Sequence, residues 1–195
     1  MKEANCFVSA LFVALLAANT LPGCATGPIL VDGRLQFLEY QFSVDSPPTG
    51  WRIVEPKSQN HLVAWQNSAT KSQIGITAIK VPAGISLQTV AETFKAAMPR
   101  AIPEMLASEF PGGKNVLVTI GEEKDLNFEG HISHRIIFNF DGLLLEGLSV
   151  SGKVIMHFFK TEKFISTLYL IAILGYYEND VAVLEQMVRS FRVVK

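Results

Sequence analysis

His131 and His134 form a His-x-x-His pair, a spacing that on a helix places two imidazoles on one face, where they can bind a metal ion. Both residues lie in a segment rich in branched and aromatic side chains, which predicts a strand. In a strand, a spacing of three places the two side chains on opposite faces of the sheet. We therefore expect no metal site, and we interpret one histidine as half-buried with a hydrogen bond and the other as lying on a more polar face.

The more polar face of this strand carries Glu129, His131 and Arg135, because alternate residues of a strand point the same way. Such a group of charged and polar side chains is a candidate binding surface. A solvated sheet face that binds nothing produces the same pattern, so both interpretations stay open.

Two other segments carry part of a known chemical motif. Gly147–Ser151 resembles the Gly-x-Ser-x-Gly elbow of serine hydrolases, but a serine replaces the second glycine and no helix is predicted after it. Gly112–Asn115 lacks the first glycine and the Ser or Thr of a phosphate-binding loop. We therefore expect no catalytic residue and no cofactor, and hence no enzyme.

The first 24 residues have the order of a secretory signal, in which Lys2 is followed by the apolar stretch Phe7–Ala18 and then by Leu21–Cys24. This last segment resembles the bacterial lipobox, whose cysteine thiol receives a diacylglyceryl group and becomes the new N-terminus. The resemblance implies that residues 1–23 are a signal peptide and that Cys24 is lipidated. A plain secretory signal with a chance cysteine is the alternative.

Lipidation at Cys24 predicts where the protein resides. Two or more acyl chains hold a protein stably on a bilayer, and residues 24–33 then form a short tether. Ala25 follows the cysteine in place of an aspartate, which by likeness to enterobacterial lipoproteins implies the periplasmic face of the outer membrane. Because Cys6 is removed with the leader, the mature chain is expected to have no free thiol and no disulfide.

The composition limits the classes of partner. Seventeen Lys and Arg against 18 Asp and Glu give a net charge of −1, which argues against a nucleic-acid partner because such proteins need an excess of basic residues. The longest apolar stretches, Phe7–Ala18 and Phe164–Tyr177, are shorter than a membrane-spanning helix. We expect a single domain over residues 34–195 that contacts the membrane through lipid on Cys24.

In the first half of the chain, the apolar pattern predicts short strands and then a helix. The expected strands are Leu35–Val44, Trp51–Val54, His61–Gln66 and Gln73–Val81, the last two forming a hairpin. Ser86 is a good N-cap for the helix that follows. Pro99 and Pro103 should end or kink this helix, with Pro103 starting a short second turn.

The second half is predicted to be mostly strand, followed by a terminal helix. The expected strands are Val116–Ile120, Gly130–Phe140, Leu143–Val150, Lys153–Phe159 and Phe164–Leu174. Asp141-Gly142 and Thr161–Lys163 are predicted turns, and Asp180 is a predicted cap of the last helix. The fold class is therefore α+β, an α/β/α sandwich whose largely antiparallel sheet is flanked by a central and a C-terminal helix.

Two short motifs in this order of elements are familiar. Pro48–Trp51 follows the first strand, and Ser190–Arg192 ends the last helix. With the hairpin, helix and meander between them, they resemble the Mog1/PsbP-like family over Gln41–Val193. The resemblance implies an α/β/α sandwich over residues 34–195 and an accessory, assembly or binding role in place of catalysis.

The sequence thus predicts a lipid-anchored, non-catalytic protein of the cell envelope that binds a protein partner or assists the assembly of a complex. The alternative is a carrier or binder of an apolar small molecule or lipid, because Trp51, Trp65 and the many phenylalanines could line a pocket. Aromatic residues in strands more often form the core. Phe158, Phe159 and Phe164 cluster around the predicted hairpin tip and are candidates either for that core or for an exposed interaction patch.

Overall fold

The computed structural model describes residues 28–55, 60–82, 84–109, 114–128, 131–143, 149–173 and 177–194. The predicted signal peptide, Cys24 and Glu129 lie outside these ranges. Within them, no helix is both long and apolar enough to cross a membrane.

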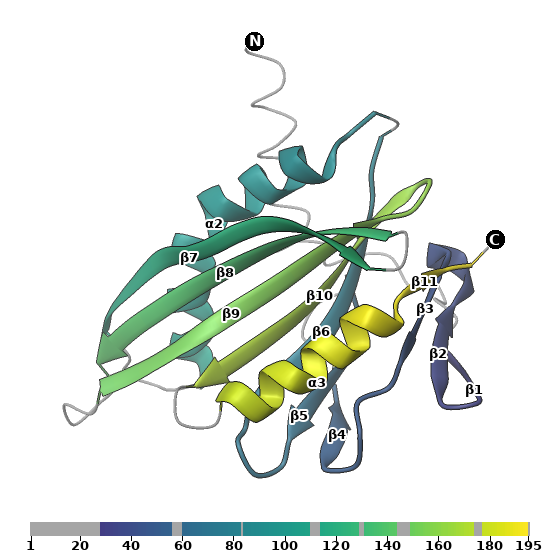
Figure 1. Ribbon diagram of the computed structural model, residues 1–195. Helices are drawn as coiled ribbons and strands as arrows, with labels where there is room; N and C mark the ends of the chain where they lie inside the picture. Colours follow the sequence, from purple (N-terminus) through teal and green to yellow (C-terminus); the bar gives the residue numbers. More distant parts are fainter. Residues whose placement is uncertain are drawn as a thin grey trace.

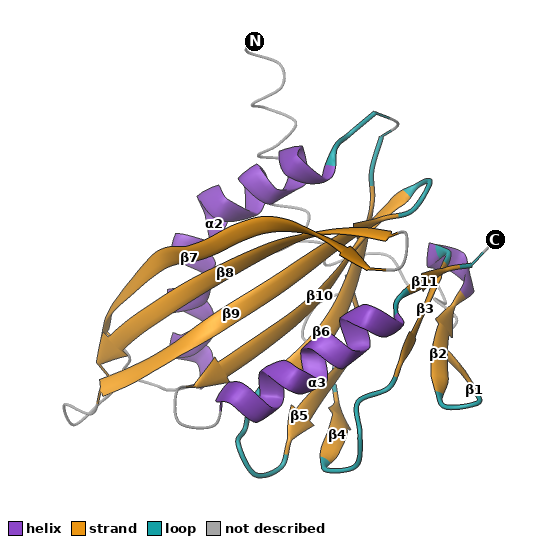
Figure 2. Ribbon diagram, in the orientation of Figure 1, coloured by secondary structure: helices purple, strands orange, loops and turns teal. Residues whose placement is uncertain are grey.

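Short strands come first along the chain, followed by a long helix, a group of long strands, a second helix and a last short strand (Figure 2). In chain order they are β1 (Ile29–Val31), β2 (Arg34–Phe37), the 3-10 helix η1 (Leu38–Tyr40), β3 (Phe42–Asp45), β4 (Trp51–Val54), β5 (His61–Asn67), β6 (Gln73–Lys80), α2 (Leu87–Glu109), β7 (Lys114–Phe128), β8 (His131–Leu143), β9 (Ser149–Lys160), β10 (Phe164–Ile173), α3 (Tyr177–Ser190) and β11 (Arg192–Val193).

The strands form two antiparallel sheets. The larger has seven strands in the order β4-β5-β6-β10-β9-β8-β7, and the smaller has four in the order β1-β2-β3-β11. Helix α2 covers one face of the large sheet and α3 the other (Figure 1). The predicted α+β class with an antiparallel sheet between two helices is confirmed, whereas the separate small sheet was not predicted.

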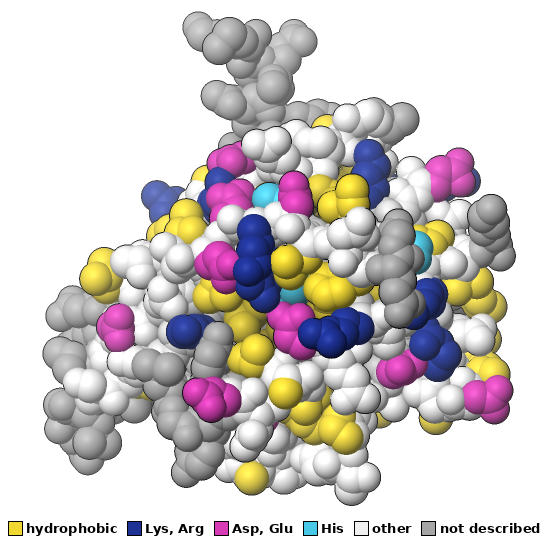
Figure 3. All heavy atoms as spheres, in the orientation of Figure 1, with side chains coloured by type: hydrophobic (Ala, Val, Ile, Leu, Met, Phe, Trp, Pro, Cys, Tyr) yellow, Lys and Arg dark blue, Asp and Glu magenta, His cyan; other side chains and the backbone are white. Residues whose placement is uncertain are grey.

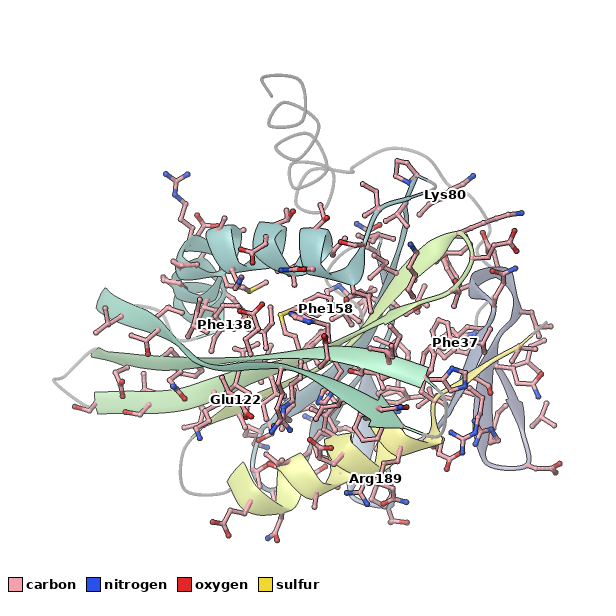
Figure 4. All side chains as sticks on the ribbon, turned by 45° about the horizontal axis from the view of Figure 1, so that its top comes forward. Phe37, Lys80, Glu122, Phe138, Phe158 and Arg189 are labelled. Carbon is pink, nitrogen blue, oxygen red and sulfur yellow. The ribbon has the colours of Figure 1, made fainter. Side chains whose placement is uncertain are left out.

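Alternating side chains of the central strands fill two hydrophobic cores, one on each face of the large sheet. Phe138 and Phe158 lie between the sheet and α2 (Figure 4). Phe159, the next residue of β9, points into the core on the α3 side, which it shares with the small sheet. Phe158 and Phe159 are 0% and 1% exposed, and Phe164 is partly buried with its ring against Tyr40. The interpretation of these three residues as an exposed patch is therefore wrong.

Helix α2 begins as predicted but continues further. The Ser86 hydroxyl accepts a hydrogen bond of 3.0 Å from the Thr89 N–H, which makes Ser86 the N-cap. The helix runs through Pro99 and Pro103 to Glu109 and bends along its length (Figure 1), as prolines inside a helix require. A separate turn starting at Pro103 is therefore wrong, because the helix keeps side chains such as Ile102 buried past the first proline.

Three boundaries in the second half also differ from the prediction. Strand β7 continues to Phe128 because its charged half pairs in register with β8. Asp141 and Gly142 lie within β8 and pair with β9, so they form no turn. Helix α3 starts before Asp180, which is 1% exposed and accepts hydrogen bonds from Asn67 Nδ2 and Thr70 Oγ1.

Replacing Gly152 with alanine should lower the free energy of unfolding by about 1–3 kcal/mol, the usual cost of overpacking. An added Cβ would lie 2.3 Å from Phe140 Cζ and 2.4 Å from the Ala172 carbonyl oxygen, which belongs to the backbone of the neighbouring strand. Gly121→Ala is the matched control, because its Cβ would meet the movable end of the Asn139 side chain at 2.5 Å. Urea unfolding should show the larger loss for Gly152→Ala, and equal losses would contradict the prediction.

Candidate functional site

His134 lies on the α2 face of β8 and joins a polar network. Its Nδ1 is 2.7 Å from Asp125 Oδ1 and its Nε2 is 3.0 Å from Glu123 Oε1, both on β7. Glu123 in turn accepts a hydrogen bond of 2.8 Å from Lys95 Nζ on α2, and this bond is the main reason that its pKa is lowered. His134 is 7% exposed. Through Glu123 and Lys95, this network links the edge of the sheet to α2.

His131 lies on the opposite face of the same strand, as the alternation of a strand requires. Its ring is edge-on to Phe191, with ring centroids 6.2 Å apart. In the described part of the chain, no group of three or more His, Cys, Asp or Glu side chains has the arrangement of a metal site.

Arg135 shares the face of His131 but is occupied by ion pairs. Its guanidinium donates to Glu185 Oε1 on α3 at 3.0 Å and to Glu122 Oε2 on β7 at 2.8 Å. The Arg135 side chain is 15% exposed. The pKa of Glu122 is lowered, first by the hydrogen bond from Lys124 and then by the charge of Arg135. Arg135 therefore crosslinks β7, β8 and α3.

Glu185, a partner of Arg135, also belongs to a polar row with Ser133 and His157 that the sequence analysis missed. Ser133 Oγ is 3.0 Å from His157 Nδ1, and His157 Nε2 is 3.7 Å from Glu185 Oε1. The order Ser, His, Glu is that of a hydrolase triad, but Ser133 and His157 are both 0% exposed. A nucleophile must be reached by its substrate, so this row is structural. The sequence feature that could have revealed this row is His157, a histidine among the apolar residues of β9.

The buried row predicts a pH dependence of stability. Burial lowers the pKa of His157 in the folded protein below the ordinary value of about 6.5, although Glu185 acts in the opposite direction. Between the lowered pKa of the folded protein and the ordinary pKa of the unfolded chain, the unfolded chain binds more protons than the folded protein. The free energy of unfolding should therefore fall as the pH decreases from about 7 to about 5. Arg135 also faces His157, and its positive charge disfavours the protonated ring.

We expect His157→Gln to flatten this pH dependence in urea unfolding measured between about pH 5 and 7. His61, whose pKa burial also lowers, should supply the remaining slope, and His61→Gln should remove it. The lowered pKa values of Glu122 and Glu185 act below about pH 4.3, outside this window. An unchanged slope in the double variant would contradict the assignment.

An open cleft of about 680 Å³ lies where the start of α2 meets the ends of β8 and β9. We call it the His131 cleft. Its lining residues are Ser86, Leu87, Gln88, Asp125, His131, Ile132, His134, Phe159, Lys160 and Phe191.

The His131 cleft combines buried aromatic rings with accessible polar groups. Phe159 and Phe191, 1% and 2% exposed, form its apolar floor, whereas Ile132 is 60% exposed. Lys160 donates from Nζ to the Ile85 carbonyl just before α2 and so holds the rim of the cleft to that helix. Such a surface can hold an apolar side chain with polar groups around it.

The structure describes two of the three residues of the predicted binding surface. His131 lines the cleft, Arg135 lies further along β8 in its ion pairs, and Glu129 is outside the described residues. A joint binding role for the three stays a prediction. Sequence reasoning missed the cleft, because its lining comes from five separate parts of the chain.

No family model and no curated protein matches this sequence. Among solved structures, the chain is similar to cyanobacterial PsbP (CyanoP) from Synechocystis sp. PCC 6803, with a TM-score of 0.57 and 12% identity over 90% of this chain and 98% of that one. The Ran-binding protein Mog1p of Saccharomyces cerevisiae aligns with a TM-score of 0.49 and 12% identity, over 83% of this chain and 95% of Mog1p. The chain therefore has an α+β fold that resembles that of PsbP.

Proposed function

We propose that this chain is a lipid-anchored, non-catalytic protein of the cell envelope that binds another envelope protein through the His131 cleft. The cleft carries the proposal, because it places an exposed apolar side chain, Ile132, beside ionisable groups on an open surface. In the row of Ser133, His157 and Glu185, the serine and the histidine are fully buried, so the row offers a substrate no access to the serine.

The proposed location rests on Cys24, whose lipidation would place the domain on the periplasmic face of the outer membrane. Cys24→Ala should yield a protein without acyl chains that remains in the soluble fraction after the membranes are sedimented. Intact mass spectrometry of the mature wild-type chain should show the added acyl chains. A wild-type mature mass without them would overturn the lipid anchor.

The partner can be tested by photo-crosslinking in native membranes. A photoreactive amino acid at position 132 should form a specific adduct with one envelope protein, because Ile132 lines the cleft and is 60% exposed. Ile53 is the matched control: it is 72% exposed and lies on β4, at the opposite edge of the large sheet. No specific adduct from position 132, or the same adducts from both positions, would overturn the proposed binding surface.

The alternative role as a carrier of an apolar molecule has less support. The aromatic side chains that suggested a pocket pack on one another, as in the stacked pair of Phe159 and Phe191, whose ring centroids are 4.0 Å apart. Trp65 is 4% exposed and belongs to the core on the α3 side. Native mass spectrometry that found a bound lipid would favour the carrier role instead.

A further inference from the structure

Four aliphatic side chains are exposed together on the small sheet. Ile29, Leu30 and Val31 make up all of β1 and are 50%, 64% and 41% exposed, and Leu38, at the start of η1, is 54% exposed. We call these four residues the apolar ridge. β1 is the outermost strand of the small sheet (Figure 1), and hydrophobic side chains lie along that edge of the molecule (Figure 3).

The exposure of the ridge is not explained by packing within the domain. Among the strands that the structure describes, β1 pairs with β2 alone, opposite Arg34, Leu35 and Gln36, and none of its three residues is buried by this pairing. Single exposed aliphatic residues are common on protein surfaces, but a contiguous group of them marks an interaction site. Ile29 and Val31 point to one side of β1 and Leu30 to the other, so this edge strand is apolar on both sides. Ile29 pairs with Gln36, which precedes Leu38 by two residues in the chain.

The short stretch of chain between Cys24 and β1 points to the bilayer as the surface that covers the ridge. Five residue steps separate Cys24 from Ile29, and even a fully extended chain of that length spans at most about 18 Å. Acyl chains on Cys24 would therefore hold the ridge close to the bilayer surface. The other exposed aliphatic residues on the sheet edges, such as Ile53 and Leu117, have no such link to the lipid.

We propose that the apolar ridge inserts into the interfacial region of the bilayer that holds the lipid anchor, and so fixes the orientation of the domain. This inference rests on the lipid anchor in the proposed function. The small sheet lies at one end of the molecule (Figure 1), so the docked domain would extend its large sheet away from the membrane.

The charges around the ridge favour a zwitterionic lipid surface. Asp32 follows β1 and Glu39 follows Leu38, and both carboxylates would be repelled by anionic headgroups. The nearest cation on β2, Arg34, is held by Asp45 at 2.6 Å and by the Ser190 carbonyl at 2.6 Å. Phosphatidylethanolamine and phosphatidylcholine are therefore the suitable test lipids.

The lipidated full-length protein allows a direct test. The mature chain would have no free thiol, so Leu30→Cys supplies a single site for an environment-sensitive fluorophore. On vesicles of phosphatidylethanolamine and phosphatidylcholine, the fluorescence emission of the label at position 30 should shift to the blue. Lipids with a nitroxide near the headgroup should quench it several-fold more than the same label at Ile53→Cys.

The outcomes separate the ridge from the anchor. If the mass shows acyl chains and the label at position 30 is as exposed to water as the label at position 53, the ridge proposal is wrong and the anchor stands. Equal quenching at both positions would mean that the domain has no fixed orientation, which also overturns it. A mature mass without acyl chains would overturn the anchor and the ridge proposal together.

Discussion

Replacing Phe191 with alanine should lower the free energy of unfolding by about 3–5 kcal/mol, the usual range for a fully buried phenylalanine. Phe191 is 2% exposed and connects the two sheets. Its ring stacks on Phe42 of β3 at 5.2 Å and on Phe159 of β9 at 4.0 Å. Phe42 stacks further on Phe37 at 4.7 Å. Alanine would leave a cavity at the junction that holds the small sheet to the large one.

Urea unfolding followed by circular dichroism measures this loss. Val193→Ala is the control, because Val193 lies two residues later, is 38% exposed and should cost less than about 1 kcal/mol. A loss below about 1 kcal/mol for Phe191→Ala would contradict the central position of this ring. Phe191 also lies in the floor of the His131 cleft, so its removal should weaken the adduct formed from position 132.

Replacing Arg135 with methionine should cost about 2–3 kcal/mol, less than the usual range for breaking a fully buried ion pair. The substitution would remove the cation that holds Glu122 and Glu185 together. The carboxylates of Glu122 and Glu185 would then lose the positive charge to which both are hydrogen-bonded. We expect a smaller loss in the free energy of unfolding than for a fully buried ion pair, because Glu122 is 37% exposed and water partly screens its interaction with Arg135.

Arg52→Met is the control for this change. Arg52 is exposed on β4 and bonds only weakly across the strand to Gln66 Oε1, at 3.1 Å, so its loss should be within about 0.5 kcal/mol. Unfolding of both variants in urea at neutral pH compares the two sites. A loss for Arg135→Met no larger than for Arg52→Met would mean that Arg135 is available for binding instead of holding β7, β8 and α3 together.

Features that depend on neighbouring residues followed from the sequence. The alternation of apolar residues in His61–Gln66 and Gln73–Val81 predicted the β5-β6 hairpin, which pairs as expected. The turn at Thr161–Lys163 joins β9 to β10. The opposite orientations of His131 and His134 also followed, because the period of a strand alone decides them.

Features that depend on long-range burial did not follow. The charged half of β7 has no strand-like composition, and only its pairing with β8 makes it a strand. Pro99 disfavours a helix locally, yet packing of Ile102 against the sheet maintains α2 beyond it. Propensity contributes a few tenths to a few kcal/mol per residue, and tertiary burial can exceed it.

The candidate sites show most clearly which features follow from adjacent residues and which depend on contacts between distant parts of the chain. By itself, the sequence determined the alternation of faces in each strand and the prediction of lipid on Cys24, because each depends on a short run of adjacent residues. It also determined the fold class, because that follows from the order of locally predicted strands and helices along the chain. Only the tertiary structure decided that Ser133, His157 and Glu185 form a closed row and that Phe191 joins His131 in a cleft. Those residues come from different strands and helices, and their contacts exist only after the sheets and α3 have packed together.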